Sequence, residues 1–219
     1  MKKYELTAEF IEKWGKKLFR IKALISFGSV EVGELGGYVE KEDNLAQDGN
    51  AWVYGDARVC GDARVCGDAE VYGNAEVYGD AEVYGNAWVC GDAEVYGNAE
   101  VYGDARVCGD AEVYGNAWVY GNARVCGDAE VYGNADYLLI GRIGSRFSFT
   151  TFFKNKDKGI TVSCGCFLGT IAEFRAKVSD THGNNKHAKI YNLAADMAEL
   201  QILGEEYFDK LNTNKSEPF

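Results

Sequence analysis

A valine recurs at every sixth position from Val53 to Val131, fourteen times without a gap. Each unit reads valine, tyrosine or cysteine, glycine, aspartate or asparagine, alanine, and one variable residue, as in residues 71–76. Self-similarity at a fixed short period is the signature of solenoids, in which each repeat buries its apolar side only by stacking on its neighbours. The middle of the chain is therefore predicted to coil rather than to form a globular domain.

Within each unit, alanine and valine stand two residues apart, as in Ala75 and Val77. Both side chains then face the same side of a short strand, and the variable residue and the tyrosine or cysteine face the other side. Glycine followed by aspartate or asparagine breaks the strand, because these residues tolerate positive φ. Repeated short strands and corners must coil, with valine and alanine lining the interior.

This pattern resembles the hexapeptide-repeat family, in which an inward aliphatic residue is followed four positions later by a small inward residue. The position after the aliphatic residue is usually small in that family, and here it is tyrosine or cysteine. The resemblance implies a left-handed parallel β-helix with three units in each triangular coil, hence about five coils. Residues 18 apart, called a column below, should then stack at roughly 4.8 Å on neighbouring strands.

The expected fold is mainly β, in three parts: a β-rich N-terminal cap (1–48), the repeat array (49–137) and an α+β C-terminal module (138–219). In the cap, residues 17–24 alternate as a half-buried strand does. Gly33, Gly36 and Gly37 are predicted to mark turns, and Val39 and Leu45 form a degenerate repeat pair leading into the array.

Two strands and two helices are predicted for the C-terminal module. The strands cover residues 145–153 and 159–167 and are joined through residues 154–158, and the helices cover 170–178 and 186–211. The second helix is expected to bury an apolar face with a period of about 3.6 residues, formed by Ile190, Leu193, Ala194, Met197, Leu200 and Leu203.

The charge of the chain is concentrated in the array. Residues 51–135 hold eight Asp, seven Glu, four Arg and no Lys, a net charge of −11, and the flanks sum to zero. Direct binding of a nucleic acid through this surface is therefore not expected. The N-terminus lacks an apolar run of signal-peptide length, and no stretch approaches the length of a membrane span. With seven cysteines, these features predict free thiols and a cytoplasmic protein that does not enter a membrane.

Sorting the array by 18 gives three faces. On the second face, glutamates and tyrosines form adjacent columns, predicted either as a solvated face or as a docking strip for a basic partner or cationic ligand: Glu76, Glu94, Glu112 and Glu130 beside Tyr78, Tyr96 and Tyr114. On the first face, Trp88, Arg106 and Arg124 either vary the surface or stack on a base and hold a phosphate. Columns of exposed aromatic residues also favour self-association, with a trimer as the expected form.

Two groups of cysteines invite a chemical interpretation. Cys90, Cys108 and Cys126 share a column, which suits a disulfide or a soft metal, but substitution at a tolerant position is the preferred explanation. Cys164 and Cys166 face the same way on a predicted strand, and with His182 and His187 they make a metal site conceivable. The spacing is not that of a zinc knuckle, so a structural role is preferred, and no metal or cofactor is expected.

The flanking motifs are similar to those of phage- and prophage-encoded hexapeptide-repeat proteins, and they occupy residues 4–7 (YELT), 35–45 (LGGYVEKEDNL), 160–171 (ITVSCGCFLGTI) and 181–191 (THGNNKHAKIY). This resemblance implies a location in the host-cell cytoplasm. We expect a non-catalytic binding or assembly protein, with inhibition of host defence by binding a host protein or sequestering a small nucleotide as its role.

Two alternatives remain. Many hexapeptide-repeat proteins are acyl- or acetyltransferases that use a histidine on a coil as general base. The array has no histidine and no inserted loop, which disfavours this activity. The other alternative is a structural spacer between the two end modules.

Overall fold

The computed structural model describes residues 2–204. By its internal contacts the chain forms two compact units, residues 1–128 and 129–219. The first unit contains the predicted cap and most of the array, and the second contains the end of the array and the predicted C-terminal module. No helix within the described range combines the length and the apolar character that crossing a bilayer requires.

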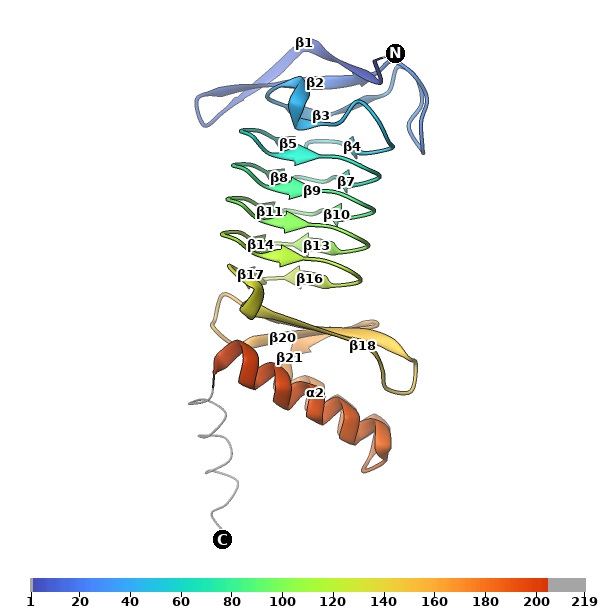
Figure 1. The fold of residues 1–219 in the computed structure, drawn as a ribbon, viewed down its shortest axis with the longest axis vertical. Helices are drawn as coiled ribbons and strands as arrows, with labels where there is room; N and C mark the ends of the chain where they lie inside the picture. The colour runs from blue at the N-terminus through green and yellow to red at the C-terminus, as the bar shows by residue number, and fades with distance from the viewer. Residues whose placement is uncertain (1, 205–219) are drawn as a thin grey trace. The chain divides into compact units, whose positions relative to one another are not determined.

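Successive short strands of the array in the first unit join three different sheets in turn, so that the chain coils (Figure 1). The sheet of the first face is β4 (Trp52–Val53), β7 (Glu70–Val71), β10 (Trp88–Val89), β13 (Arg106–Gly109) and β16 (Arg124–Gly127). The second face continues through β5 (Arg58–Val59), β8 (Glu76–Val77), β11 (Glu94–Val95) and β14 (Glu112–Val113). The third consists of β6 (Arg64–Val65), β9 (Glu82–Val83), β12 (Glu100–Val101) and β15 (Trp118–Val119).

All three faces pair in parallel with an 18-residue offset. Val77 pairs with Val95, Val89 with Val107, and Val83 with Val101. Three repeat units therefore make one turn, and the first face supplies five turns. The predicted mainly-β solenoid of about five coils is confirmed; its left hand stays a prediction.

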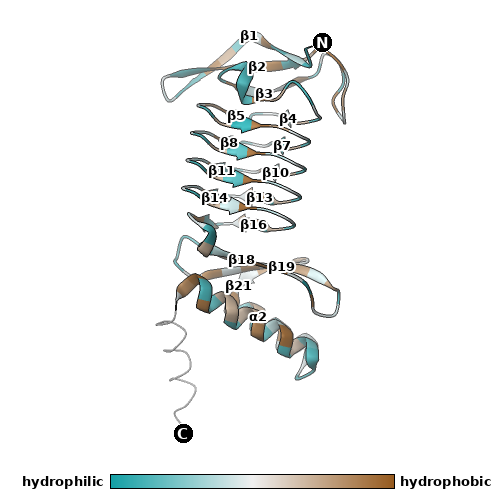
Figure 2. Cartoon of the chain, viewed as in Figure 1, coloured by the Kyte–Doolittle hydropathy of each residue, from teal (hydrophilic) through white to brown (hydrophobic). Residues whose placement is uncertain are grey.

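Valine and alanine fill the interior, as predicted. Every repeat valine from Val53 to Val131 is fully buried, and so is every repeat alanine from Ala51 to Ala129. Figure 2 shows the consequence on strands such as β5, β8 and β11, where a hydrophilic residue is followed by a hydrophobic one. The solenoid is thus held by burial of small aliphatic side chains together with a continuous hydrogen-bond ladder.

The corner glycines are required for two reasons, which Gly85 illustrates. Its φ of +72° lies in the left-handed region, which side chains other than glycine rarely adopt. In addition, a Cβ atom at this position would lie 2.9 Å from the backbone nitrogen of Gly103 on the next coil. Successive corners are therefore stacked too closely for any side chain at this place.

At several corners an asparagine faces the aspartate of the next coil. Asn50 Nδ2 donates to Asp68 Oδ1 at 2.7 Å, and Asn74 donates to Asp92 at 2.8 Å. Asn86 makes the same contact with its neighbour one coil later. An amide opposite a carboxylate replaces the repulsion that two carboxylates on neighbouring strands would cause.

Three antiparallel strands cap the first coil. It comprises β1 (Tyr4–Lys13), β2 (Lys16–Ala23) and β3 (Leu35–Val39), followed by a short 3-10 helix, η1 (Glu42–Asn44). β2 confirms the strand predicted at 17–24. Because β3 then pairs in parallel with β5, the cap covers an edge that would otherwise be open to association. Trp52 is fully buried here, with its ring against those of Tyr4 and Phe27.

The junction of cap and array corrects one prediction and explains another. Gly36 and Gly37 lie within β3, not in turns; a Cβ atom on Gly37 would approach the carbonyl oxygen of Ala57 at 2.5 Å. These glycines therefore permit close approach to the first coil. Val39 pairs with Val59, and Leu45 bridges to Val65, so the predicted degenerate pair does precede the array, at an offset of 20 residues rather than 18.

Cys108 and Cys126 face each other on the paired strands β13 and β16 and form a disulfide. The prediction that all seven cysteines are free is therefore wrong. The five free thiols belong to Cys60, Cys66, Cys90, Cys164 and Cys166. The error arose because tyrosine occupies the same column elsewhere, which makes the position look tolerant of exchange.

The second unit begins with β17 (Glu130–Val131) and a 3-10 helix, η2 (Asn134–Asp136). An antiparallel sheet follows, made of β18 (Tyr137–Ile143), β19 (Ser148–Lys154), β20 (Ile160–Cys164) and β21 (Phe167–Thr170). Among the described residues of this unit two helices follow, α1 (Ile171–His182) and α2 (Lys186–Leu203). The sheet thus has four strands where two were predicted. β18 was not predicted, because it directly follows the last repeat unit. The segment predicted as one strand at 159–167 is divided into β20 and β21 by a tight turn at Gly165.

The helices also differ from their predictions. Thr170 is the N-cap of α1 rather than its first residue, and the helix runs to His182. α2 ends at Leu203 with Gly204 as its C-cap; the remainder of the predicted helix, residues 205–211, lies outside the described residues.

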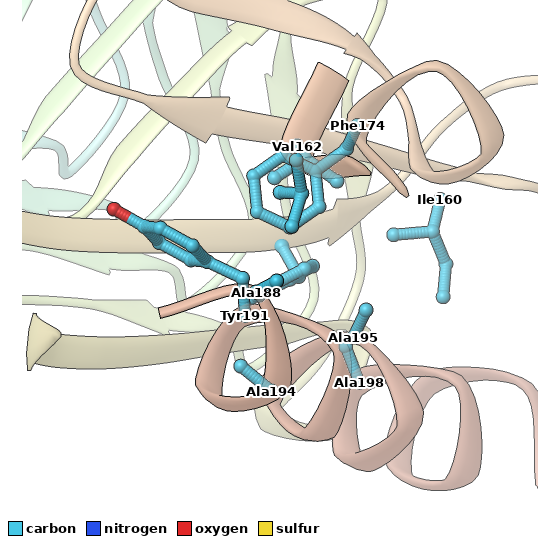
Figure 3. Packing of buried hydrophobic residues seen from close by; sticks show 10 residues of the cluster. Ile160, Val162, Phe174, Ala188, Tyr191, Ala194, Ala195 and Ala198 are labelled. Atoms are coloured by element: carbon cyan, nitrogen blue, oxygen red, sulfur yellow. The ribbon is translucent and has the colours of Figure 1, made fainter. Parts of the chain in front are cut away.

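The face of α2 that packs inward is not the predicted one. Small and aromatic residues, including Ala188, Tyr191, Ala195 and Ala198, pack against Phe174 and the sheet (Figure 3). Of the predicted apolar face, Ala194 is buried and Leu203 packs partly buried against the same cluster; the exposed side chains are Ile190, Leu193, Met197 and Leu200. Alanines bring the helix close to its neighbours, so the larger apolar residues remain outside.

Candidate functional site

The predicted strip on the second face exists as two regular columns. Glu76, Glu94 and Glu112 stand in register on β8, β11 and β14. Beside them, the rings of Tyr78 and Tyr96 stack with centroids 4.8 Å apart, and Tyr114 continues the stack at 5.0 Å. Glu130 belongs to the second unit, where it is half-buried on β17.

The glutamates of this strip are already engaged by the chain itself. Tyr78 donates to Glu94 at 2.7 Å, and Tyr96 donates to Glu112 at 3.0 Å. Burial, followed by the hydrogen bond to the carboxylate, raises the pKa of both phenols well above the ordinary value. Repulsion between carboxylates stacked on neighbouring strands is therefore offset by neutral hydroxyl donors.

Glu76 differs most from its prediction. Its side chain is buried between the ammonium of Lys13, with which it forms an ion pair, and the guanidinium of Arg58 at 2.9 Å. The expectation that Glu76 presents a free carboxylate to a partner is corrected. Lys13 ends β1, far away in sequence, and no periodicity within the array indicated this contact.

The first face brings together the aromatic and cationic residues that the 18-residue sorting predicted. Trp88 pairs with Arg106, and Arg106 pairs with Arg124, on successive strands. The guanidinium carbon of Arg106 lies 4.2 Å from the centroid of the Trp88 ring. This is a cation–π contact, so one of the two arginines is bound to the tryptophan of the preceding coil.

On the other side of Trp88 the same face is hollowed into a shallow groove of about 450 Å³. The aromatic groove, as we call it, is lined by Ser29, Tyr54, Glu70, Tyr72 and Trp88. The rings of Tyr72 and Trp88 meet edge to face at 6.2 Å, and the hydroxyls of Ser29 and Tyr54 lie 3.0 Å apart. The walls are therefore aromatic and partly fixed by contacts within the protein.

The electrostatics of the aromatic groove are those of a single carboxylate among neutral rings. Burial and the neighbouring Cys90 raise the pKa of Tyr72 to about 12, and burial raises the pKa of Tyr54. Both phenols are thus uncharged near neutral pH, whereas Glu70 is the acidic side chain in the lining. Such a surface suits a cation better than an anion.

Sequence reasoning placed Tyr54, Glu70 and Tyr72 on the first face but did not select them as site residues. The signal was present, since the sorting by 18 sets both tyrosines next to Glu70 and Trp88. Ser29 could not be found in this way, because it comes from the connection between β2 and β3, outside the repeat.

In the second unit, the four cysteine and histidine residues do not come together as one cluster. Cys164 ends β20 and is half-buried, whereas Cys166 lies in the following turn and is exposed, so the two do not share a strand face. The rings of His182 and His187 are 5.8 Å apart. Within residues 2–204, no group of three or more His, Cys, Asp and Glu side chains has an arrangement suited to a metal ion.

Comparison with known proteins supports the repeat class. A family model described as the YdcK β-solenoid repeat matches residues 105–121, which lie within the solenoid. A search of curated proteins gives no match to the chain. The shared feature is thus the repeat itself.

Proposed function

We propose that this β-solenoid repeat protein is a non-catalytic binding protein that docks a basic segment of a partner protein in its aromatic groove. The observation that carries the proposal is the pairing of Glu70 with the rings of Tyr72 and Trp88 in one exposed hollow. A lysine or arginine side chain entering it gains a carboxylate and aromatic faces together.

The chain itself provides an example of this recognition. Arg106 already stacks on Trp88 at 4.2 Å, so this column accepts a guanidinium at the spacing of the coils. The rings of Tyr54 and Tyr72, which also line the groove, offer the arginine of a partner further aromatic faces. The net charge of −11 in the array adds long-range attraction for a basic partner.

A small nucleotide is the less favoured ligand of this face. Its phosphates require cations, and the side chain that charges the aromatic groove is the carboxylate of Glu70. Arg106 is engaged with Trp88. The sequestration role considered above therefore gives way to binding of a protein.

The source and setting belong to the same proposal. The motifs flanking the array are similar to those of phage- and prophage-encoded hexapeptide-repeat proteins, which supports a partner in the host cytoplasm and a role in countering host defence. An acyltransferase remains the alternative, and it is disfavoured by the array, which contains no histidine. A spacer without any partner is the remaining alternative.

Association between copies of the chain, with a trimer as the expected form, is part of the proposal. Ile190, Leu193, Met197 and Leu200 expose an apolar stripe on α2, with Leu193 63% and Met197 57% accessible. A second copy would remove this surface from water. Sedimentation velocity should show an oligomer that Met197→Glu shifts toward monomer, and a monomeric wild type at all concentrations contradicts the association.

The binding proposal is tested with a fluorescent peptide of alternating glycine and arginine. We expect binding to the wild type, and a loss of about tenfold in affinity with Glu70→Gln, which removes the charge from the groove. Glu82→Gln is the matched control, because it removes the same charge from the third face. It should bind as the wild type does.

Three outcomes contradict the proposal: no binding of the basic peptide, an equal loss with both variants, or equal binding of a peptide in which glutamate replaces arginine. An equal loss of affinity in both variants would mean that the peptide responds to the net charge of the array and not to the aromatic groove. Turnover of acetyl-coenzyme A by the wild type would instead favour the transferase.

A further inference from the structure

A second hollow lies wholly within the second unit and has the opposite charge. It has a volume of about 220 Å³ and is enclosed by the β18–β19 turn, the β20–β21 turn, the last turns of α1, and α2. Its basic side chains come from two of these elements: Arg146 from the first turn, and Lys177 and His182 from α1. We call it the basic pocket.

None of the described residues that line the basic pocket carries a carboxylate. Among residues 2–204, neither Arg146 nor Lys177 takes part in an ion pair, although α1 also carries Arg175, which is paired with Asp196 and Glu199 at 2.7 Å. Positive charge is therefore gathered in the pocket without a counterion among residues 2–204, in a chain whose net charge is −11.

The floor of the basic pocket is formed by Tyr191, which packs into the core of the second unit. Tyr191 is 6% exposed and packs edge to face against Phe174 at 5.6 Å, and its hydroxyl points away from the other labelled side chains (Figure 3). Gly144 leaves the space that this hydroxyl occupies, since a Cβ atom there would collide with it. The ring of His182 stacks on Tyr191 at 5.7 Å. Two of the lining groups are thus fixed by the core.

Hydroxyl and thiol groups complete the lining. Ser148 and Thr181 add hydroxyls at the wall, and the Cys164 sulfur, which accepts a hydrogen bond from Thr150 at 3.2 Å, lies beside Tyr191. Burial raises the pKa of Tyr191 further above neutrality, so that its phenol remains protonated. A guanidinium nitrogen of Arg146 lies 3.8 Å from where a Cβ atom on Gly165 would stand.

We propose that the basic pocket binds a phosphate group, either inorganic phosphate or the phosphoryl end of a small metabolite. A phosphate dianion offers several acceptor oxygens and two charges, which match a guanidinium, an ammonium and an imidazole converging with hydroxyl donors. A carboxylate would use fewer of these donors. The small volume admits the phosphoryl group and leaves the rest of a larger molecule outside.

The test uses full-length protein and inorganic phosphate, followed by ³¹P NMR and calorimetry. We expect saturable binding, at least tenfold weaker for Arg146→Gln and for Lys177→Gln. Both side chains are exposed, so these variants should retain the wild-type unfolding temperature. Lys189→Gln, on an exposed position of α2 outside the lining, is the control for charge and should bind as the wild type does.

A second arm identifies the source of the ligand. Glycerol phosphate binding more tightly than inorganic phosphate indicates a metabolite, and the reverse order indicates free phosphate. Absence of saturable phosphate binding, equal loss with all three variants, or acetate binding as tightly as phosphate overturns the proposal. The outcome is independent of the aromatic groove, because Glu70→Gln should leave phosphate binding unchanged.

Discussion

The phenol of Tyr84 donates a 2.8 Å hydrogen bond to the carboxylate of Glu100, which lies on the adjacent strand of the third face. Burial and this hydrogen bond raise the pKa of Tyr84 above its ordinary value. The same contact recurs on the second face, so hydrogen bonds from the tyrosine columns offset the electrostatic repulsion between stacked glutamates.

Tyr84→Phe should therefore destabilise the solenoid by about 1 kcal/mol, the net value of one such hydrogen bond. Tyr102→Phe is the matched control. Its ring stacks on Tyr84 at 4.9 Å. The position that corresponds to Glu100, 16 residues after the tyrosine, is Trp118 in this case, and it has no carboxylate to accept the hydrogen bond. Urea unfolding should separate the two variants, and an equal loss in both would assign the effect to ring stacking.

The corner glycines give a second prediction. Gly85→Ala should lower stability by roughly 1–3 kcal/mol more than Gly15→Ala, because strained backbone and steric overlap act together. Both glycines have φ of +72°, but a Cβ atom on Gly15 meets nothing within 4 Å, whereas one on Gly85 meets the next coil. Thermal unfolding of the two variants measures the difference. Similar midpoints would show that the loss of stability comes from the positive φ alone and not from steric overlap with the next coil.

How much of this could be read from the sequence depended on whether a contact repeats. The inward valines and alanines, the 18-residue register and the columns follow from the period alone. The burial of Glu76 does not, because Lys13 belongs to the cap. On α2 the wrong face was chosen because Leu193 and Met197 are more apolar than alanine, whereas close helix packing selected the smaller Ala195 and Ala198.

The cap makes stability depend on pH through Lys3. Its ammonium is buried against the carbonyl oxygens of Asp48 and Ala51, and desolvation lowers its pKa to about 8. Between about pH 8 and the ordinary value of 10.5 the unfolded chain binds more protons, so this group adds stability as the pH rises.

The corresponding test compares Lys3→Met with the wild type by urea unfolding. The stability of the wild type relative to Lys3→Met should increase from pH 7.5 to 9.5, because this range spans the lowered pKa of about 8. Lys2→Met, which alters an exposed neighbour, should show no such trend. A difference that stays constant with pH would contradict the assigned burial of the ammonium.

The disulfide makes a prediction that needs only a thiol assay. Denatured protein prepared without reductant should release five free thiols, and seven after reduction. Reduction should also lower stability by up to about 3 kcal/mol, because the bond closes a loop in the unfolded chain. Cys126→Ser should remove the effect of reductant on stability, whereas Cys90→Ser should preserve it; seven reactive thiols from the start would refute the bond.

The constant offset of 18 residues has a consequence for how such a chain can lengthen during evolution. Duplication of one whole turn keeps each outward column on its own face, so valine stays over valine, and a Tyr–Glu contact is kept where the duplicated turn supplies both residues. Duplication of a single hexapeptide also leaves valine over valine, but it moves every downstream outward residue to the next face of the solenoid, so the outward columns no longer continue. Natural length variation in solenoids of this sequence is therefore expected in steps of three units, which sets the reach of the rod in increments of one strand spacing.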